Sequence, residues 1–483
     1  MKKETIILYG GFLLVSAASM FISKTGQHIA SGLLLLLGAV FLYVYFYRKT
    51  KSLVNFKGLL SLSFVGGEGI AAFQLSNLQT DWSIMTWVCF AAFYLSFLAG
   101  YDGKEWQYRK KDKMGNGRRT DEAADTKVGK AGAEKRKRME KRLLISAVAV
   151  SAVSFAAFLT EACILGYVPL FSKDTHAYNY FHITGIHYFT VTCMMVHALT
   201  LIYWMVHREN QKMGISGKQS RKNLAVLIVS NAAALSIAIL CISKFQFLLT
   251  VALPLFIYLM MKRNVNTKRI LLVGGGIAVL VILVMIVMIM RRNYAPGYLN
   301  DIFEMKDPNL PMFVQYPYIY VANNYANFNC LVEQMTEHTL GLRMAFPLFA
   351  LTGLKFVSPI REWLVLPVYL TKTELNTLTI IYDAYYDFGL IGVILFGILL
   401  GCACAFLARE MRENKNPVIY LFGGQIAVYL ALSFFSTWFS VSTTWFWLAV
   451  TGAIYWYVGT DWKGISKKIK RKQKAWKQKG ENE

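Results

Sequence analysis

The sequence predicts an all-α polytopic membrane protein, with about 12 transmembrane helices in one bundle and a large, partly helical extracytoplasmic loop. Its 483 residues are 55% hydrophobic and only 17% charged, whereas about a quarter of the residues in a soluble globular domain are charged. Apolar runs of roughly 20 residues, the length that crosses about 30 Å of hydrocarbon, recur along the whole chain. Lysine and arginine gather in alternate connections between these runs. We therefore expect one integral-membrane domain over residues 1–483.

Each apolar run must satisfy its backbone as a helix if it crosses lipid. The first run follows Met1-Lys2-Lys3-Glu4 and resembles a secretory signal, but a second run follows directly, so we expect an uncleaved first helix. The third run is the weakest because it contains Glu68. The predicted spans are residues 6–22, 29–47, 58–75, 82–100, 143–165, 185–206, 223–243, 245–261, 270–290, 388–408, 418–435 and 443–458.

The charges of the connections predict that both termini are cytoplasmic. The basic connections are residues 48–57, 101–142, 207–222, 262–269, 410–415 and the tail 461–483. The intervening connections are residues 23–28, 76–81, 166–184, 243–244, the long loop 291–387 and residues 436–442. Most of this second set carry little positive charge, and the positive-inside rule places them outside the cytoplasm. The net charge of +24 therefore reflects membrane topology, and we expect no nucleic-acid partner.

Two cytoplasmic segments are strongly charged. Residues 101–142 contain Lys135-Arg136-Lys137-Arg138, and form either a solvated loop, partly helical toward Arg142, or a docking site for a partner. The tail 461–483 contains Trp476 among many lysines. It either lies on anionic lipid head groups, at about 1 kcal/mol per charge, or is disordered.

No motif for a metal or a nucleotide is present in the sequence. The seven cysteines lie almost all inside apolar runs, without the spacing of a zinc site, and are expected to be small core residues. Gly274-Gly275-Gly276 precedes no phosphate-binding lysine, so it is expected to pack helices. We expect neither a cofactor nor a metal. No internal repeat is evident, which argues against a major-facilitator transporter.

The long loop between two apolar runs, from Arg291 to Gly392, is expected to be the working face, because a long polar loop kept by a membrane protein is usually functional. Lysine and arginine residues on the extracytoplasmic side could bind phosphate. Lys244, in a very short hairpin, either snorkels to head groups or binds an anion. Arg291 and Arg292 violate the positive-inside rule and favour bidentate recognition of phosphate. Arg343 and Arg361 are similar candidates, with solvation or surface ion pairs as the alternative.

Several residues on the same side could act as an acid or a base, and spacing alone does not choose among them. They are His176, His182, His187, Glu333, Glu337, His338, Glu374, Asp383 and Asp387. His187 favours a packing role inside its span over that of a base. Asp387 precedes Phe388-Gly389 at a helix start, so an N-cap competes with a catalytic role.

Tyrosines and asparagines cluster between residues 316 and 329. Tyrosine rings stack on sugars and amides bind hydroxyls, so the cluster predicts glycan contact, with an interfacial aromatic belt as the alternative. Its members are Tyr316, Tyr318, Tyr320, Asn323, Asn324, Tyr325, Asn327 and Asn329.

Four places in the chain resemble one protein family, between about residues 143 and 409. They are the turn Gly166-Tyr167-Val168-Pro169-Leu170, the hairpin Ser243-Lys244, the loop from Arg291 through Gly341-x-Arg343, and Asn376-Thr377-Leu378-Thr379 followed by Asp387-Phe388-Gly389-x-x-Gly392. In this order they are similar to the bacterial oligosaccharide repeat-unit polymerases (Wzy type) of the O-antigen polymerase and ligase group. The last of these four motifs is the most specific.

The resemblance implies a metal-independent glycosyltransferase in the bacterial cytoplasmic membrane. Such an enzyme joins polyprenyl-diphosphate-linked oligosaccharides into a surface polysaccharide, and works in the lipid bilayer beside flippase and chain-length regulator proteins. The implied catalytic residues are Lys244, Arg291, Arg292, His338, Arg343 and Asp387. The implied substrate-binding residues are Tyr316, Tyr320, Asn324, Tyr325, Arg361, Glu374, Asn376 and Thr379.

Two departures from the family pattern matter. Lys244 stands where relatives commonly have arginine, which replaces a bidentate fork by a point charge. The related ligases carry a histidine near the position of Asn376, so the sequence favours a polymerase over a ligase and leaves the base unidentified. A flippase or transporter would need ionisable groups at mid-membrane, where Glu68 and Glu161 are the acidic candidates. A non-catalytic scaffold would not need pairs of outer arginines.

Overall fold

The computed structural model describes residues 3–114, 129–174, 177–262, 275–276 and 297–460, and these residues form helices without a named strand. Eight helical stretches in this part of the chain are long and apolar enough to cross a membrane. The stretches, with their bounds, are α1 (Lys3–Lys24), α2 (His28–Thr50), α5 (Ile84–Met114), α6 (Lys130–Leu165), the continuous run α8 (Ile186–Thr190), 3₁₀ turn (Val191–Met194) and α9 (Met195–Lys212), α10 (Arg221–Leu240), α11 (Lys244–Met261) and α17 (Tyr382–Glu413).

The remaining predicted spans do not meet the same criteria, so the count of 12 stays a prediction. Residues 56–71 form a broken helix of α3 (Phe56–Leu60), a π-helical turn (Ser61–Val65) and α4 (Gly66–Ala71). Helix α18 (Ile419–Ala431) has only 13 residues, and α19 (Ser442–Gly459) has 18. Apart from residues 275–276, the run 270–290 lies outside the described residues.

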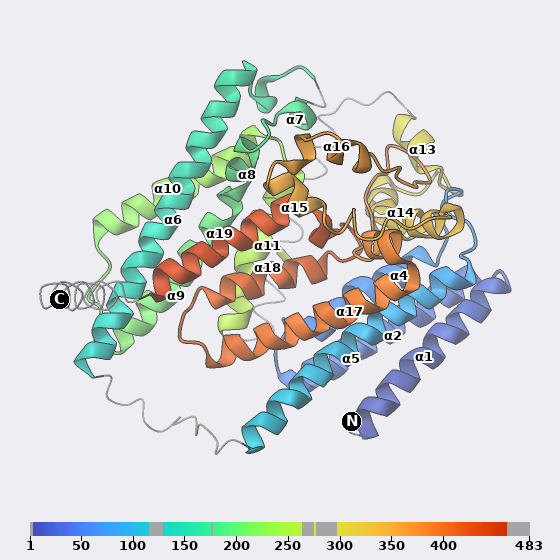
Figure 1. Cartoon of the computed structure of the whole chain (residues 1–483), viewed down its shortest axis with the longest axis horizontal. Helices are drawn as coiled ribbons and strands as arrows, with labels where there is room; N and C mark the ends of the chain where they lie inside the picture. The colour runs from blue at the N-terminus through green and yellow to red at the C-terminus, as the bar shows by residue number, and fades with distance from the viewer. Residues whose placement is uncertain (1–2, 115–128, 175–176, 263–274, 277–296, 461–483) are drawn as a thin grey trace, which may run out of the picture.

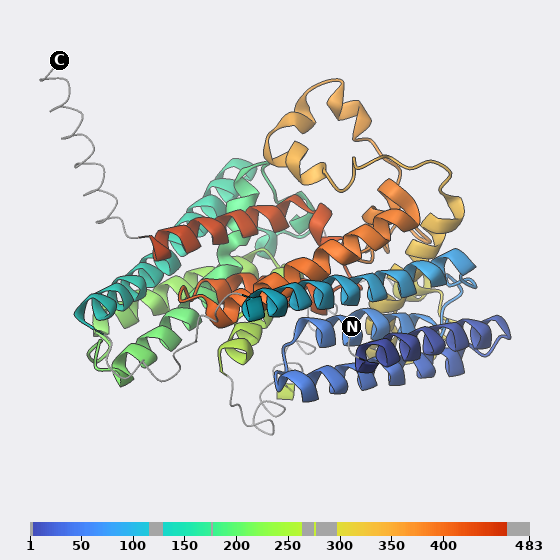
Figure 2. The same cartoon turned by 60° about the horizontal axis from the view of Figure 1, so that its bottom comes forward.

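The helices form two groups joined by α11 and α18 (Figure 1). Helices α1, α2, α5 and α17 run side by side in one group, and α6, α9, α10 and α19 lie in the other, as the turned view in Figure 2 also shows. Small residues permit the closest contact, between α5 and α17. A Cβ atom at Gly401 would lie 2.1 Å from the carbonyl oxygen of Phe97, so only glycine fits there.

Contacts between connections agree with the predicted alternation of sides. At one end of the bundle, the Lys306 N–H donates to Leu75 O at 2.9 Å, and the Ile380 N–H donates to Ser433 O at 2.8 Å. At the other end, Lys57 pairs with Asp102 at 2.7 Å and Arg409 with Asp112 at 2.8 Å. Each pair joins a residue in a connection or at the end of a predicted span to another on the side that the charge pattern gives it. Which end faces the cytoplasm rests on the charge pattern alone.

The described part of the long loop is more compact than the sequence suggested. It contains α13 (Tyr298–Phe303), α14 (Met312–Gln334), α15 (Phe346–Leu351), a 3₁₀ turn (Leu354–Phe356) and α16 (Ile360–Trp363). Of the 23 residues of α14, 13 are buried. This segment is therefore a packed helix and not an open loop, because its tyrosines and asparagines turn inward onto the bundle.

Candidate functional site

The site is built around a break near the start of α17. Phe388 (φ −142°, ψ 15°) and Gly389 (φ 59°, ψ −147°) interrupt the helical backbone within α17. The positive φ of Gly389 is the left-handed region, which glycine enters without steric cost. A Cβ atom at this position would lie 2.8 Å from Nε2 of His338, so a larger residue would also displace that ring. The break directly follows Asp387. The Asp387 carboxylate can therefore bind groups from another part of the chain.

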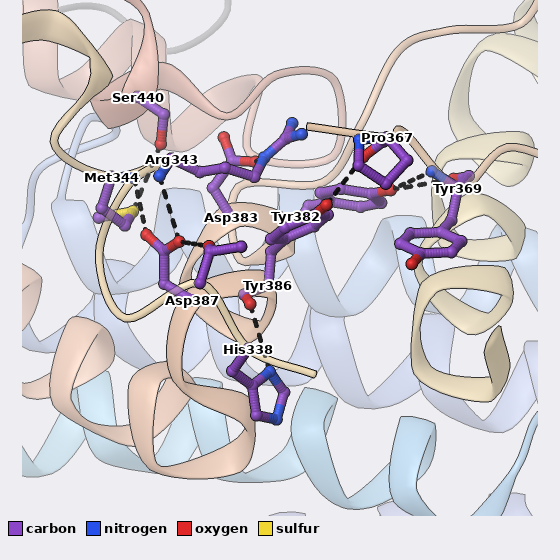
Figure 3. Close-up of polar contacts among 11 residues, drawn as sticks. His338, Arg343, Met344, Pro367, Tyr369, Tyr382, Asp383, Tyr386, Asp387 and Ser440 are labelled. Atoms are coloured by element: carbon purple, nitrogen blue, oxygen red, sulfur yellow. Dashed lines mark hydrogen bonds and ion pairs between the residues drawn. The ribbon is translucent and has the colours of Figure 1, made fainter. Parts of the chain in front are cut away.

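Asp387 holds the connection that carries Arg343. Its fully buried carboxylate accepts hydrogen bonds from the backbone N–H groups of Arg343, at 3.1 Å, and Met344, at 2.7 Å. The hydroxyl of Thr339 donates to the same carboxylate (Figure 3). The main-chain oxygen of Asp387 also accepts from the Leu340 N–H at 3.1 Å. Asp387 thus caps a distant turn rather than its own helix, and its role is to position residues 339–344.

Arg343 is held in one orientation by α17. Its Nε–H donates to the carboxylate of Asp383, which is buried, and its Cζ lies 4.5 Å from the ring centroid of Tyr386 and 5.5 Å from that of Tyr382. Burial alone would lower the pKa of Arg343, but the Asp383 carboxylate outweighs burial and raises that pKa. The guanidinium therefore stays charged. The bond to Asp383 uses Nε–H, which leaves N–H donors on the terminal nitrogens for an anion.

The two tyrosines beneath Arg343 anchor the wall of the site. Tyr386 donates its hydroxyl hydrogen to Pro367 O at 3.0 Å, and Tyr382 donates to Tyr369 O at 3.0 Å. The Tyr369 N–H returns a bond to the Tyr382 hydroxyl at 2.9 Å. These bonds fix Pro367 and Tyr369, in a segment without regular secondary structure, beside Arg343 (Figure 3).

His338, a predicted catalytic residue, lies on the side of Tyr386 away from Arg343 (Figure 3). Its Nδ1 is 3.2 Å from the main-chain oxygen of Tyr386, so Nδ1 must carry the proton. The ring meets Tyr385 edge-on at 5.7 Å between centroids. These contacts hold His338 against the break in α17.

Lys244 belongs to a second cluster at the same end of the bundle. It follows Ser243, whose hydroxyl oxygen accepts from the Gln246 N–H at 3.3 Å and caps α11. Its Nζ donates to the Tyr316 hydroxyl at 3.2 Å, and Tyr316 in turn donates to Tyr320 at 2.9 Å. Three residues singled out from the sequence therefore meet in one cluster.

The Lys244 and Arg343 clusters border the same connection, between α18 and α19. Phe245, next to Lys244, stacks on Trp438 at 5.5 Å between ring centroids. Ser440 donates its hydroxyl to the sulfur of Met344, next to Arg343, at 3.3 Å. This connection thus contacts the chain neighbours of both cations, Phe245 and Met344.

Asn324 and Tyr325 lie inside the protein, where their polar groups serve the fold. Asn324 donates to Tyr320 O and to Phe434 O, each at 2.7 Å, and Tyr325 donates to Phe64 O at 2.6 Å. Both side chains are fully buried. They contact other protein groups where the sequence predicted sugar contacts.

Asparagines of α14 hold the segment that carries the Asn-x-x-Thr motif. Asn327 donates to Leu375 O at 2.8 Å and to Thr377 O at 3.0 Å. The Thr377 hydroxyl donates to Oδ1 of Asn324 at 2.5 Å. Side-chain amides of α14 therefore hold residues 371–377 by hydrogen bonds to their main-chain oxygens.

The other predicted site residues are scattered. Arg361, Glu374 and Asn376 are exposed on the segments after Arg343. Thr379 is fully buried, and its hydroxyl has no hydrogen-bond partner among the described residues. Arg291 and Arg292 lie outside the described residues.

The residues that surround Arg343 were not predicted as its partners. Tyr382, Asp383, Tyr386 and Asp387 recur at positions i, i+1, i+4 and i+5, which places them on one face of a helix. From this spacing, the sequence alone could have predicted a polar helix face near the outer cations.

No protein-family model matches the sequence, no curated protein matches it, and no solved structure matches the fold.

Proposed function

We propose that this chain polymerises polyprenyl-diphosphate-linked oligosaccharide repeat units into a surface polysaccharide at the outer face of the bacterial cytoplasmic membrane. One observation carries the proposal. The Asp387-x-Gly389 motif, the most specific point of resemblance to repeat-unit polymerases, directly fixes the backbone of Arg343, the cation of the second resembling motif. Two motifs that are 44 residues apart thus form one unit.

The reaction requires positive charge where the carrier diphosphate leaves. The bond between the donor's anomeric carbon and diphosphate oxygen breaks, and an acceptor hydroxyl oxygen takes its place on that carbon. Arg343 offers a charged guanidinium held by Asp383 and two tyrosine rings, so it needs little reorganisation as negative charge develops. Lys244 supplies a second cation at the same end of the bundle. Its neighbours Tyr316 and Tyr320 stack on each other at 4.6 Å between ring centroids, and Tyr320 also stacks on Phe435, so these rings hold Lys244 in place.

The topology belongs to the same proposal. About 12 spans with both termini cytoplasmic would put the Arg343 and Lys244 clusters on the outer face. This is the face at which a flippase would deliver the lipid-linked unit, and at which a chain-length regulator would act. A contact between same-side connections, in which the Asn77 N–H donates to Glu304 O at 2.8 Å, supports the alternation on which the assignment depends.

Purified protein in lipid vesicles, supplied with carrier-linked repeat units from a polysaccharide-producing strain, tests the proposal. Wild-type protein should lengthen the glycan chains without a nucleotide sugar. Arg343→Ala should reduce the rate about 100- to 1000-fold, the usual loss when one preorganised contact to developing charge is removed. Lys306→Ala is the control, because Lys306 is an exposed cation in the same loop and belongs to neither the Arg343 nor the Lys244 cluster, and it should stay near the wild-type rate.

Two results would overturn the proposal. Wild-type protein that leaves the units unjoined, while transferring preassembled chains to another acceptor, would identify a ligase. Wild-type chain lengths from a well-folded Arg343→Ala variant would remove Arg343 from the site.

A further inference from the structure

A second polar site lies at the same end of the bundle, around a buried carboxylate of α6. Glu161 is fully buried, and its oxygens accept from the Ile183 N–H at 2.9 Å and the Thr190 hydroxyl at 2.7 Å. Nδ1 of His187 lies 3.1 and 3.2 Å from the two carboxylate oxygens. Since an ionised carboxylate only accepts, Nδ1 must carry a proton in this geometry. The lone pair of a neutral His187 ring is then on Nε2.

His187 opens onto a cavity of about 280 Å³. The cavity wall includes Tyr178, His182, Tyr188 and, from the long loop, Lys355. The His187 side chain is 23% exposed, whereas Glu161 behind it is fully buried. No described residue hydrogen-bonds Nε2 of His187, so this atom is accessible to a ligand in the cavity.

A second glutamate–histidine pair in the same protein has no such opening. Glu140 and His207 form a similar pair at the other end of α6, with Nδ1 at 2.6 Å from the carboxylate. There the His207 side chain is only 5% exposed, and Nε2 is buried without a partner among the described residues. The His207 pair is sealed, and the His187 pair faces a space that a ligand can enter.

The cavity adjoins the helix end that carries Lys244. The Tyr178 hydroxyl accepts a hydrogen bond from Nε2 of Gln246 at 3.1 Å, and Gln246 is in the first turn of α11. Tyr178 also lies 6.3 Å from His187 between ring centroids. One tyrosine therefore separates the His187 cavity from the turn in which Lys244 stands.

We propose that His187, oriented by Glu161, is the base that takes the proton from the acceptor sugar hydroxyl, an inference that rests on the proposed polymerase function. Nε2 accepts the hydroxyl proton while that oxygen bonds to the donor's anomeric carbon. The anomeric carbon–oxygen bond to diphosphate breaks, and the diphosphate leaves with the bonding electron pair. The imidazolium then returns its proton to solvent. Glu161 acts as a positioning residue that fixes the tautomer and the ring.

His187→Asn tests the base in the polymerisation assay. The asparagine amide nitrogen takes the place of Nδ1 and keeps the hydrogen bond to Glu161, but no basic nitrogen faces the cavity. The rate should fall by about 100-fold or more, and the acid limb of the pH–rate profile should disappear. His28→Asn is the control, since His28 pairs with Asp81 at 3.7 Å and does not line this cavity, and it should keep both the rate and the acid limb.

Glu161→Gln gives a second, independent readout. A neutral partner stabilises the imidazolium less than a carboxylate does, so the acid limb should move to lower pH. The titratable and charged groups facing His187 are Glu161, Tyr178, His182, Tyr188 and Lys355, and only Glu161 contacts Nδ1. A purely structural role for Glu161 would lower protein stability without moving that limb.

Failure of the proposed function and failure of the base assignment give different results. Wild-type protein that does not polymerise the units would refute the proposed function and, with it, the role of His187. Wild-type protein that polymerises, together with folded His187→Asn and Glu161→Gln variants that keep the wild-type acid limb, would refute the base alone. Folding is checked by thermal unfolding of each variant in detergent.

Discussion

Asp387 should act on the reaction only through Arg343, and graded substitutions measure this. Thr339→Val removes one donor to the Asp387 carboxylate, whereas Asp387→Ala leaves three donors without their acceptor: two backbone N–H groups and the Thr339 hydroxyl. A donor left without a partner costs about 1–3 kcal/mol when it is buried, and these three bonds are partly buried, so the lower end of that range applies to each. Asp387→Ala should therefore destabilise the protein by at least about 3 kcal/mol, Asp387→Asn by less, and Thr339→Val by about 1 kcal/mol.

Thermal unfolding in detergent should place these variants in that order. Glu374→Gln, an exposed carboxylate in the same loop, is the control and should unfold like the wild type. The activity assay then uses a double variant. If Asp387 only positions Arg343, Asp387→Asn combined with Arg343→Ala should be no slower than Arg343→Ala alone. Additive losses of rate, or a wild-type unfolding temperature for Asp387→Ala, would refute the reasoning.

Two further predictions concern the outer face. Lys244→Ala should nearly abolish polymerisation at normal protein abundance, and Lys244→Arg should keep substantial activity because the charge is preserved; wild-type chain lengths from Lys244→Ala would remove Lys244 from the site. A cysteine placed at Asn309, which is exposed, should react with an impermeant thiol reagent in intact cells, while one at Asn116 should not; the opposite pattern would overturn the orientation.

The helices could be predicted well because hydrophobicity and backbone satisfaction are local properties. The run predicted at residues 223–243 corresponds to α10, Arg221–Leu240, and the run at 245–261 to α11, Lys244–Met261. The broken helix over residues 56–71 was harder to predict from the sequence. Its π-helical turn brings Gly67 within reach of Tyr325, a residue from a distant segment.

The partners within the site could not be predicted because they come from distant parts of the chain. The sequence identified Arg343 as a cation, but no spacing rule joins it to Asp383, which is 40 residues away. It left Asp387 between an N-cap and a catalytic group, and the structure gives it donors from residues 339–344 instead. The sequence favoured a packing role for His187 because this residue falls inside a predicted span. Its contact with Glu161 and the cavity depends on other elements, which spacing along the chain does not reveal.

The contacts of helix α14 predict the order in which the outer half of the protein folds during biosynthesis. Its anchors are groups of earlier segments, such as Phe64 for Tyr325 and Ser83 for Asn329. With the orientation proposed above, the long loop crosses the membrane as an extended chain and folds only afterwards, against helices already inserted. Residues 371–377 then dock on the amides of α14. We expect the outer half to mature in that order during biosynthesis, with protease resistance appearing first in α14 and last in the segment before α17.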